Sequence, residues 1–270
     1  MGKFLNYFVI ILLGLVFIIP LIWVFITSIS PTNEIIGQSN PFWTSNPTLK
    51  NFADAWEAAP FLRYYYNTLV IVVGVLAVQL LTITLAAYAF ARVNFWGKEV
   101  VFILFLIQLM IQPEILLFPN YQIMAQLGLV DTKLAVMMPY WASAFGMFLM
   151  RQTFKQVPYE LDEASKMDGS RWWQTLWHVY IPAARPTYVA FALVSVSTHW
   201  SNFLWPLIVT DSVSNRPLTV GLALFAQAFE TGAQWGIITA GTVTVIFPLL
   251  IAFFFFQKQF VSSFMHSGIK

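Results

Sequence analysis

Residues 5–28 read LNYFVIILLGLVFIIPLIWVFITS, and this stretch decides the class of fold. It contains no charged side chain, and it is long enough for a helix to cross a bilayer core, which takes roughly 20 apolar residues. A signal peptide has an apolar region of only about 7–15 residues followed by a small-x-small cleavage site. Because this stretch is longer, contains Pro20 and Trp23 and lacks such a site, we expect a retained first transmembrane helix.

Further apolar stretches of similar length follow along the chain. They lie at residues 66–90, 100–119, 134–150, 187–209 and 236–257. The stretch at 134–150 is at the short end of the range that spans a membrane. Together with 5–28, they predict an all-α polytopic bundle of six transmembrane helices, which forms one domain over residues 1–270.

The composition excludes several classes of protein. Hydrophobic residues make up 59% of the 270 residues and charged residues only 10%, whereas soluble domains carry roughly 25% charged residues. A soluble globular protein and a disordered chain are therefore both excluded. The absence of cysteine excludes disulfides and Cys-ligated metal sites. A net charge of +2, with no stripe of basic residues, makes nucleic acid an improbable partner.

Basic residues are distributed unequally between the two sets of loops that six spans create. With a cytoplasmic N-terminus, ten basic residues face the cytoplasm and four face outward, as the positive-inside rule expects. The inner set is Lys3, Arg92, Lys98, Arg151, Lys155, Lys166, Arg171, Arg185, Lys258 and Lys270, and the outer set is Lys50, Arg63, Lys133 and Arg216. We therefore place both termini in the cytoplasm and expect polar outer loops near 30–62 and 210–235.

The most polar stretch lies between the fourth and fifth spans. Residues 151–186 read RQTFKQVPYELDEASKMDGSRWWQTLWHVYIPAARP. Pro158 suits the first turn of a helix, and Gly169 can adopt the left-handed conformation that ends one. Acidic side chains near the positive end of a helix dipole are favourable, and here they are Glu160, Asp162 and Glu163. The pattern predicts a short helix outside the membrane.

A second short helix is expected directly after the first. Ser170 can cap its start, and we expect it to run to about Tyr180 and to stop at Pro182. The hairpin carries three tryptophans of the type that dominates protein interfaces, namely Trp172, Trp173 and Trp177. The composition alone leaves two alternatives open, a docking surface for a partner protein or an amphipathic helix lying on the membrane surface.

The spacing in this loop resembles the EAA loop of bacterial ABC importer permeases, which reads E-A-A-x3-G-x9-I-x-L-P. The matching residues are Glu163, Ala164, Ser165, Gly169, Val179, Ile181 and Pro182. Ser165 replaces the second alanine, and Val179 and Ile181 replace isoleucine and leucine. The resemblance is strongest to the carbohydrate-type permeases related to MalG, and it extends to Ala87–Arg92, Leu127–Gly128–Leu129 and Trp205–Pro206–Leu207. The tail from Phe260 to Lys270 departs from many relatives.

The resemblance implies a transport subunit of a bacterial inner-membrane importer that works by alternating access and is not itself an enzyme. It assigns coupling to a partner ATPase to Glu163, Ala164, Ser165, Asp168, Gly169 and Pro182. ATP and Mg would be bound by that ATPase, since this chain has no G-x4-G-K-[ST] phosphate loop. The expected partners are a second, non-identical permease subunit, a dimer of ATP-binding subunits, an extracytoplasmic solute-binding protein and the lipid bilayer.

Polar residues inside the spans are candidates for the solute path. Ser195, His199 and Asn202 recur on one face of the fifth span, Gln108 and Gln112 lie one turn apart in the third, and Trp205 offers an apolar ring. These groups suit a neutral, hydroxyl-rich solute, although hydrogen bonding between helices is the alternative for each. The resemblance implies a sugar, an oligosaccharide or a polyol phosphate as the solute.

The sequence fits two other classes of membrane protein less well. A secondary transporter or channel would ordinarily carry ionisable groups inside its spans, for which Glu114 is the only acidic candidate. A membrane enzyme needs clustered catalytic groups, and the sequence contains neither metal-ligand spacing nor a nucleophile with an activating base.

Overall fold

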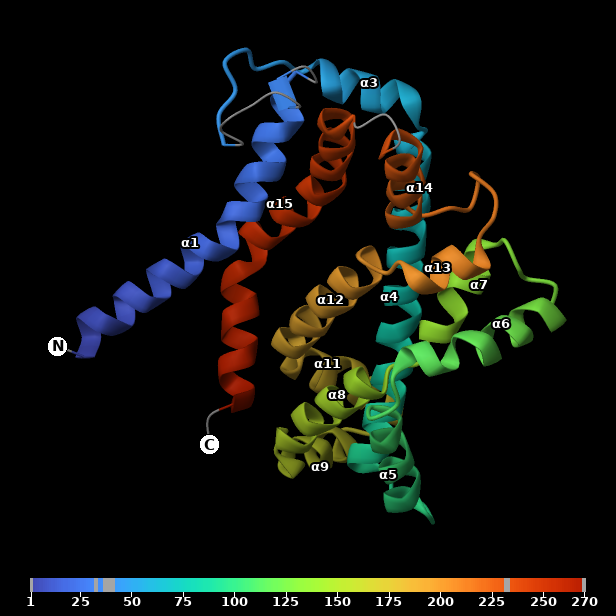
Figure 1. Cartoon of the computed structure of the whole chain (residues 1–270). Helices are drawn as coiled ribbons and strands as arrows, with labels where there is room; N and C mark the ends of the chain where they lie inside the picture. Colours follow the sequence, from blue (N-terminus) through green and yellow to red (C-terminus); the bar gives the residue numbers. More distant parts are fainter. Residues whose placement is uncertain (1, 32–33, 36–41, 231–233, 269–270) are drawn as a thin grey trace. The chain divides into compact units, whose positions relative to one another are not determined.

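The computed structural model describes residues 2–31, 34–35, 42–230 and 234–268. Within these residues the regular structure is helical throughout, which confirms the predicted all-α class (Figure 1). The helices in chain order are α1 (Gly2–Ile29), α3 (Lys50–Ala58), α4 (Phe61–Arg92), α5 (Lys98–Gln108), η1 (Pro113–Leu116), α6 (Leu117–Gln126), α7 (Lys133–Met137), η2 (Met138–Tyr140), α8 (Ala144–Gln156), α9 (Tyr159–Met167), α10 (Trp172–Thr175), η3 (Leu176–Tyr180), α11 (Ile181–Ala183), α12 (Arg185–Trp200), α13 (Leu204–Val209), α14 (Leu218–Glu230) and α15 (Trp235–Gly268).

The chain forms two compact units, of which the first comprises Met1–Tyr65 and Pro217–Ala252. In this unit Asn51 of α3 is buried, and its Nδ2 donates to the carbonyls of Ser28 at 3.0 Å and Ser30 at 2.8 Å, at the end of α1. A Cβ at Gly236 would lie 2.7 Å from the same Nδ2. The start of α15 therefore approaches α3 closely only because residue 236 has no side chain.

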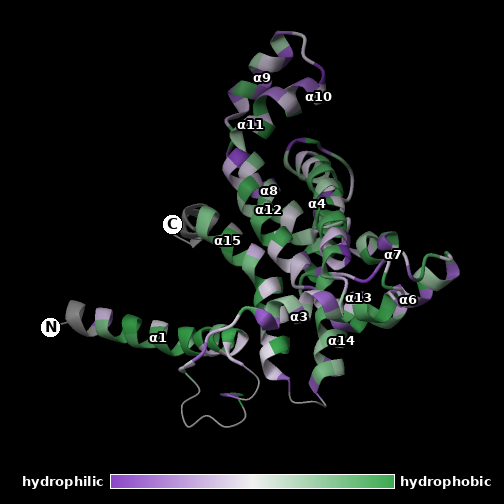
Figure 2. Ribbon diagram, turned by 90° about the horizontal axis from the view of Figure 1, so that it is seen from above, coloured by the Kyte–Doolittle hydropathy of each residue, from purple (hydrophilic) through white to green (hydrophobic). Residues whose placement is uncertain are grey.

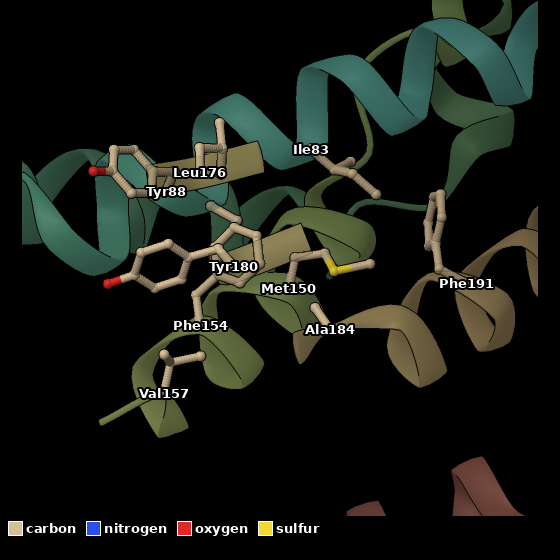
Figure 3. Close-up of a cluster of buried hydrophobic side chains, with 10 residues drawn as sticks. Ile83, Tyr88, Met150, Phe154, Val157, Leu176, Tyr180, Ala184 and Phe191 are labelled. Carbon is tan, nitrogen blue, oxygen red and sulfur yellow. The ribbon is translucent and has the colours of Figure 1, made fainter. Parts of the chain in front are cut away.

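The second unit comprises Tyr66–Arg216 and Phe253–Lys270, and its largest apolar cluster joins α4, α8, the η3–α11 segment and α12. Figure 3 shows the ring of Tyr180 lying among side chains of this cluster. The buried members are Ile83, Ala87, Tyr88, Met150, Phe154, Val157, Leu176, Tyr180, Ala184 and Phe191. A Cβ at Gly146 would lie 2.5 Å from the Phe191 ring, so the glycine permits close packing of α8 on α12.

Among the described residues, three helical segments are long and apolar enough to cross a membrane, namely Asn6–Ile29, Phe61–Arg92 and Trp235–Phe255. They contain the predicted spans 5–28, 66–90 and 236–257 in large part. Two further pairs of helices pass the same test only as bent pairs: Lys98–Gln108 with Pro113–Gln126, bent by 98°, and Trp172–Ala183 with Arg185–Trp200, bent by 77°.

The predicted stretches at 100–119, 134–150 and 187–209 are thus interrupted helices. In the first, α5 ends at Gln108 and η1 begins at Pro113, which lacks the amide hydrogen that would continue the helix. The second is divided among α7, η2 and the start of α8, and the third is divided between α12 and α13. An apolar stretch indicates which residues lie within the membrane, but it does not indicate where a helix is interrupted.

The predicted outer loops contain helices that the sequence analysis did not anticipate. The segment at 30–62 includes α3, and the segment at 210–235 includes α14. Leu218, Gly221 and Phe225 are buried and share one face of α14, an apolar spacing that favours a helix. Lys270, one of the basic residues expected in the cytoplasm, lies outside the described residues.

Candidate functional site

The first helix of the EAA loop forms as predicted. Pro158 is the N-cap of α9, and Gly169 has a φ of 76°, in the left-handed region that glycine adopts without strain. The Gly169 N–H donates to the Lys166 carbonyl and the Ser170 N–H to the Ser165 carbonyl, both at 3.0 Å. These two bonds form the Schellman motif that closes a helix at its C-terminus.

The second helix differs from the prediction at both ends. Its N-cap is Arg171, whose N–H donates to Oε1 of the Gln174 side chain at 2.7 Å. Ser170 is therefore not the cap, because the helix begins at Trp172, one residue later than predicted. Pro182 does not stop the helix, which continues through α11 to Ala183. The π-helical turn η3 precedes Pro182, and this wider turn accommodates a ring that would clash with the carbonyl four residues earlier.

The helix α9 rests on the second helix through one polar face. Asp162 is buried, and its Oδ1 accepts a hydrogen bond from the Tyr180 hydroxyl at 3.3 Å. Its Oδ2 accepts one from Lys166 Nζ at 2.9 Å, and this bond raises the pKa of the exposed Lys166. Ser165 Oγ lies 2.8 Å from the hydroxyl oxygen of Thr175. The replacement of alanine by Ser165 therefore adds a hydrogen bond between the two helices.

The opposite face of α9 is open to the surroundings. Glu163 and Ala164 are exposed, as are Asp168 and Gly169 at the helix end. Large apolar side chains of the same loop are also exposed, with fractions of 89% for Met167, 57% for Trp172, 46% for Trp173 and 68% for Trp177. Figure 2 shows α9 and α10 with hydrophilic and hydrophobic residues interspersed. The loop thus exposes both the site residues and large apolar side chains of the kind that anchor a partner.

A second group of polar residues lies between α4, η2 and α12. Ser195 is buried and donates to Gln79 Oε1 at 2.6 Å. Gln79 Nε2 donates to the Tyr140 carbonyl at 2.8 Å and lies 3.3 Å from His199 Nε2. The rings of Tyr140 and His199 are 4.7 Å apart, and Asn202 Nδ2 donates to the Tyr140 hydroxyl at 2.8 Å. We call these five residues the polar cluster.

The structure brings together three of the six residues predicted for the solute path. Ser195, His199 and Asn202 belong to the polar cluster, which also contains Gln79 and Tyr140, two residues that the sequence analysis missed. A signal for Gln79 was present, since it is one of only two amides in the stretch 66–90, the other being Asn67 near its start, and an amide inside a span needs a partner.

The other three residues lie elsewhere. Gln108 ends α5 and Gln112 precedes η1, and both are exposed. Trp205 is 2% exposed, and its indole N–H donates to the Ala135 carbonyl at 3.1 Å within an apolar cluster of α4, α7 and α13. In this structure Trp205 holds helices together, which is the alternative that the sequence left open.

The two sites have the features of a membrane permease with an external docking helix, and comparison with known proteins identifies the family. Residues 1–265 match the family described as binding-protein-dependent transport system inner membrane component. The chain belongs to this family. The resemblance stated from the EAA loop is therefore confirmed, and the protein is a permease subunit of an ABC importer.

Two relatives illustrate the breadth of the family. The lactose transport system permease protein LacG of Rhizobium radiobacter is 33% identical over 262 residues, which cover 97% of this chain and 94% of the relative. The sn-glycerol-3-phosphate transport system permease protein UgpE of Rhizobium meliloti is 24% identical over 258 residues, covering 93% and 92% of the two chains.

Among solved structures, a chain of a bacterial ABC transporter involved in the import of the acidic polysaccharide alginate has the same fold. Its TM-score is 0.85 with 24% sequence identity, and the match covers 95% of each chain. This likeness confirms the helical permease fold. The curated relatives and the solved structure are aligned over nearly their full length, so the fold comparison applies to the whole domain.

Proposed function

We propose that this permease subunit imports an uncharged saccharide across the cytoplasmic membrane, with ATP hydrolysed on a separate ATPase dimer that docks on α9. The observation that carries the proposal is the orientation of α9. Asp162 and Ser165 bond to the second helix, whereas Glu163 and Ala164 are exposed in a loop that also exposes three tryptophans. A small residue at the centre of an exposed helix allows a partner surface to approach closely.

The remaining parts of the importer follow from the family and the charge distribution. We place both termini in the cytoplasm with six passes, as the ratio of ten inner to four outer basic residues favours. A second, non-identical permease subunit would complete the path, ATP and Mg would bind to the ATPase, and a solute-binding protein would deliver the solute from outside. A periplasmic protein accompanies one structural neighbour, which has a TM-score of 0.67 to this chain.

The polar cluster favours a saccharide over a phosphate ester. Its amides, hydroxyls and imidazole donate and accept hydrogen bonds, as a sugar requires. Lys and Arg are absent from its five residues, whereas phosphate groups are commonly bound by Arg, Lys or helix N-termini. Relatives named for lactose, for arabino-oligosaccharides and for sn-glycerol 3-phosphate are all similar to this chain, so our proposal of a saccharide rests on the chemistry of the cluster.

The test uses the assembled complex in proteoliposomes, with the binding protein outside and ATP enclosed. Radiolabelled lactose, arabinobiose and sn-glycerol 3-phosphate serve as probes. We expect ATP-dependent uptake of a saccharide, loss of that uptake in Glu163→Lys, and near-normal uptake in Glu160→Lys, a matched control because Glu160 is an exposed acid on the same helix. Uptake without the ATPase would overturn ATP coupling, and uptake of sn-glycerol 3-phosphate alone would overturn the solute class.

A further inference from the structure

Two arginines join the inner ends of α4 and α8, because each helix carries one arginine that bonds to backbone carbonyls at the end of the other. Arg92, the last residue of α4, donates from Nη2 to the carbonyls of Phe154 at 2.9 Å and of Val157, at the end of α8. Arg151 of α8 is buried and donates from Nε to the Phe90 carbonyl of α4 at 3.2 Å. Carbonyls in the last turn of a helix lack the usual amide partner four residues on. The Phe154 carbonyl also accepts from the Val157 N–H at 3.3 Å, and each arginine supplies a side-chain donor to the other helix.

Arg92 also contacts both helices of the EAA loop. Its guanidinium carbon lies 5.8 Å from the ring centre of Tyr159, the first residue of α9, and 5.1 Å from that of Tyr180, the last residue of η3. A cation over an aromatic face within about 6 Å is attracted to it. The Val157 carbonyl, which accepts from Arg92, belongs to the C-cap of α8, directly before the N-cap Pro158 of α9.

Tyr180 extends this contact to the centre of α9. Its side chain is fully buried, and its ring packs against Tyr88 and Phe154 with ring centres 5.3 Å away in both cases. In Figure 3 the hydroxyls of Tyr88 and Tyr180 lie at the same edge of the apolar cluster. The Tyr180 hydroxyl donates to Asp162, which is the residue directly before Glu163 and points inward.

We propose that Arg92 is a positioning residue that ties the EAA helix α9 to the inner end of α4, so that the two helices move as one body. The chain of contacts runs from Arg92 to Tyr180, from Tyr180 to Asp162, and directly from Arg92 to the peptide that begins α9. The proposal deepens the proposed function and rests on it, since an ATPase docked on α9 would then displace a membrane-spanning helix directly.

The tether is tested by the distance between spin labels on α9 and α4. The chain contains no cysteine, so two cysteines can be introduced without removing any, at the exposed Glu160 and at Leu81, which is 61% exposed. Distances are measured by pulsed electron paramagnetic resonance in lipid nanodiscs, in the nucleotide-free complex and after trapping with Mg-ATP and vanadate. We expect the wild-type distance to be narrowly distributed and equal in the two states.

Arg92→Gln is expected to broaden the distribution in the nucleotide-free state and to shift its mean on trapping. Tyr180→Phe removes only the bond to Asp162, and it should change the distribution in the same direction by less. Arg63→Gln, at the other end of α4, is the matched control and should match the wild type. The proposal is overturned if both Arg92→Gln and Tyr180→Phe stay as narrow and unshifted as the wild type, or if the wild-type distance itself shifts on trapping.

The same measurement separates the tether from the proposed function. If the ATPase does not co-purify with the wild-type chain, the proposed docking on α9 fails. Broadening by Arg92→Gln in the nucleotide-free nanodisc would still support the tether in that case, and unchanged width would refute it.

Discussion

The left-handed turn at Gly169 allows a prediction whose magnitude follows from the backbone alone. The residue has a φ of 76°, and a Cβ built there meets nothing within 4 Å. A substitution therefore costs no steric overlap with neighbouring side chains, and what remains is the penalty for placing an L-residue in the left-handed region, about 1–2 kcal/mol. Asparagine adopts this region more readily than other non-glycine residues, so its penalty is smaller.

We expect Gly169→Ala to weaken the end of α9 by about 1 kcal/mol, Gly169→Asn by less and Gly169→Val by more. A difference of about 1.4 kcal/mol is a factor of ten in an equilibrium, so alanine should raise local opening about fivefold. Hydrogen exchange followed by mass spectrometry reports this opening at the amides of residues 169 and 170, which close the helix by bonds of 3.0 Å.

The effect should stay local, with α12 exchanging as in the wild type. ATPase retention on the purified complex should fall in the same order, because the site residues Asp168 and Gly169 would no longer be held at the end of α9. Equal exchange in all four proteins would refute the reasoning. A loss of the same size for asparagine and valine would also contradict it, since the backbone penalty distinguishes these two residues.

Three further predictions test other parts of the molecule. Glu163→Lys should reduce ATPase co-purification several-fold while leaving the thermal unfolding temperature of the chain within error, because the side chain is exposed; a large drop in unfolding temperature would show that Glu163 is structural. Gln79→Leu removes the acceptor of the Ser195 hydroxyl and should lower the free energy of unfolding by about 1–3 kcal/mol. The expected readouts are a lower denaturation midpoint and slower saccharide uptake. An unchanged midpoint would argue against the polar cluster as described. The carboxylate of Asp131 is partly desolvated, which opposes ionisation, but bonds from the N–H groups of Ser212 and Asp211 outweigh this and lower its pKa. Because the pKa of Asp131 is lower in the folded state, its stabilisation is complete above the unfolded value of about 3.9 and is lost as the pH falls through the folded value. A spin label at Val213 should become more mobile over that pH range. If Asp131→Asn showed the same transition, the transition would belong to another group.

The sequence predicted those parts of the EAA loop that depend on local chemistry. A proline before the first turn and a glycine after the last one place the two ends of α9, and the structure has Pro158 and Gly169 in those positions. The same local reasoning was wrong at Ser170 and Pro182. The Ser170 backbone belongs to the motif that closes α9, and the second helix begins one residue later with Arg171 as its N-cap. The π-helical turn made room for the Pro182 ring. Each outcome depended on a neighbouring element whose geometry the pattern does not contain.

The sequence by itself determined that this chain is helical, that it belongs in a membrane and that it carries an EAA loop, because apolar length, charge scarcity and residue spacing are properties of the chain. Only the tertiary structure decided which polar groups meet. Gln79 and Tyr140 join Ser195 and His199 because α4, η2 and α12 pack together, and Asp162 turns inward because Tyr180 lies beneath it. Helix ends are set by bonds within a few residues, whereas partners across helices are set by packing, and a buried polar group must find its partner wherever packing places one.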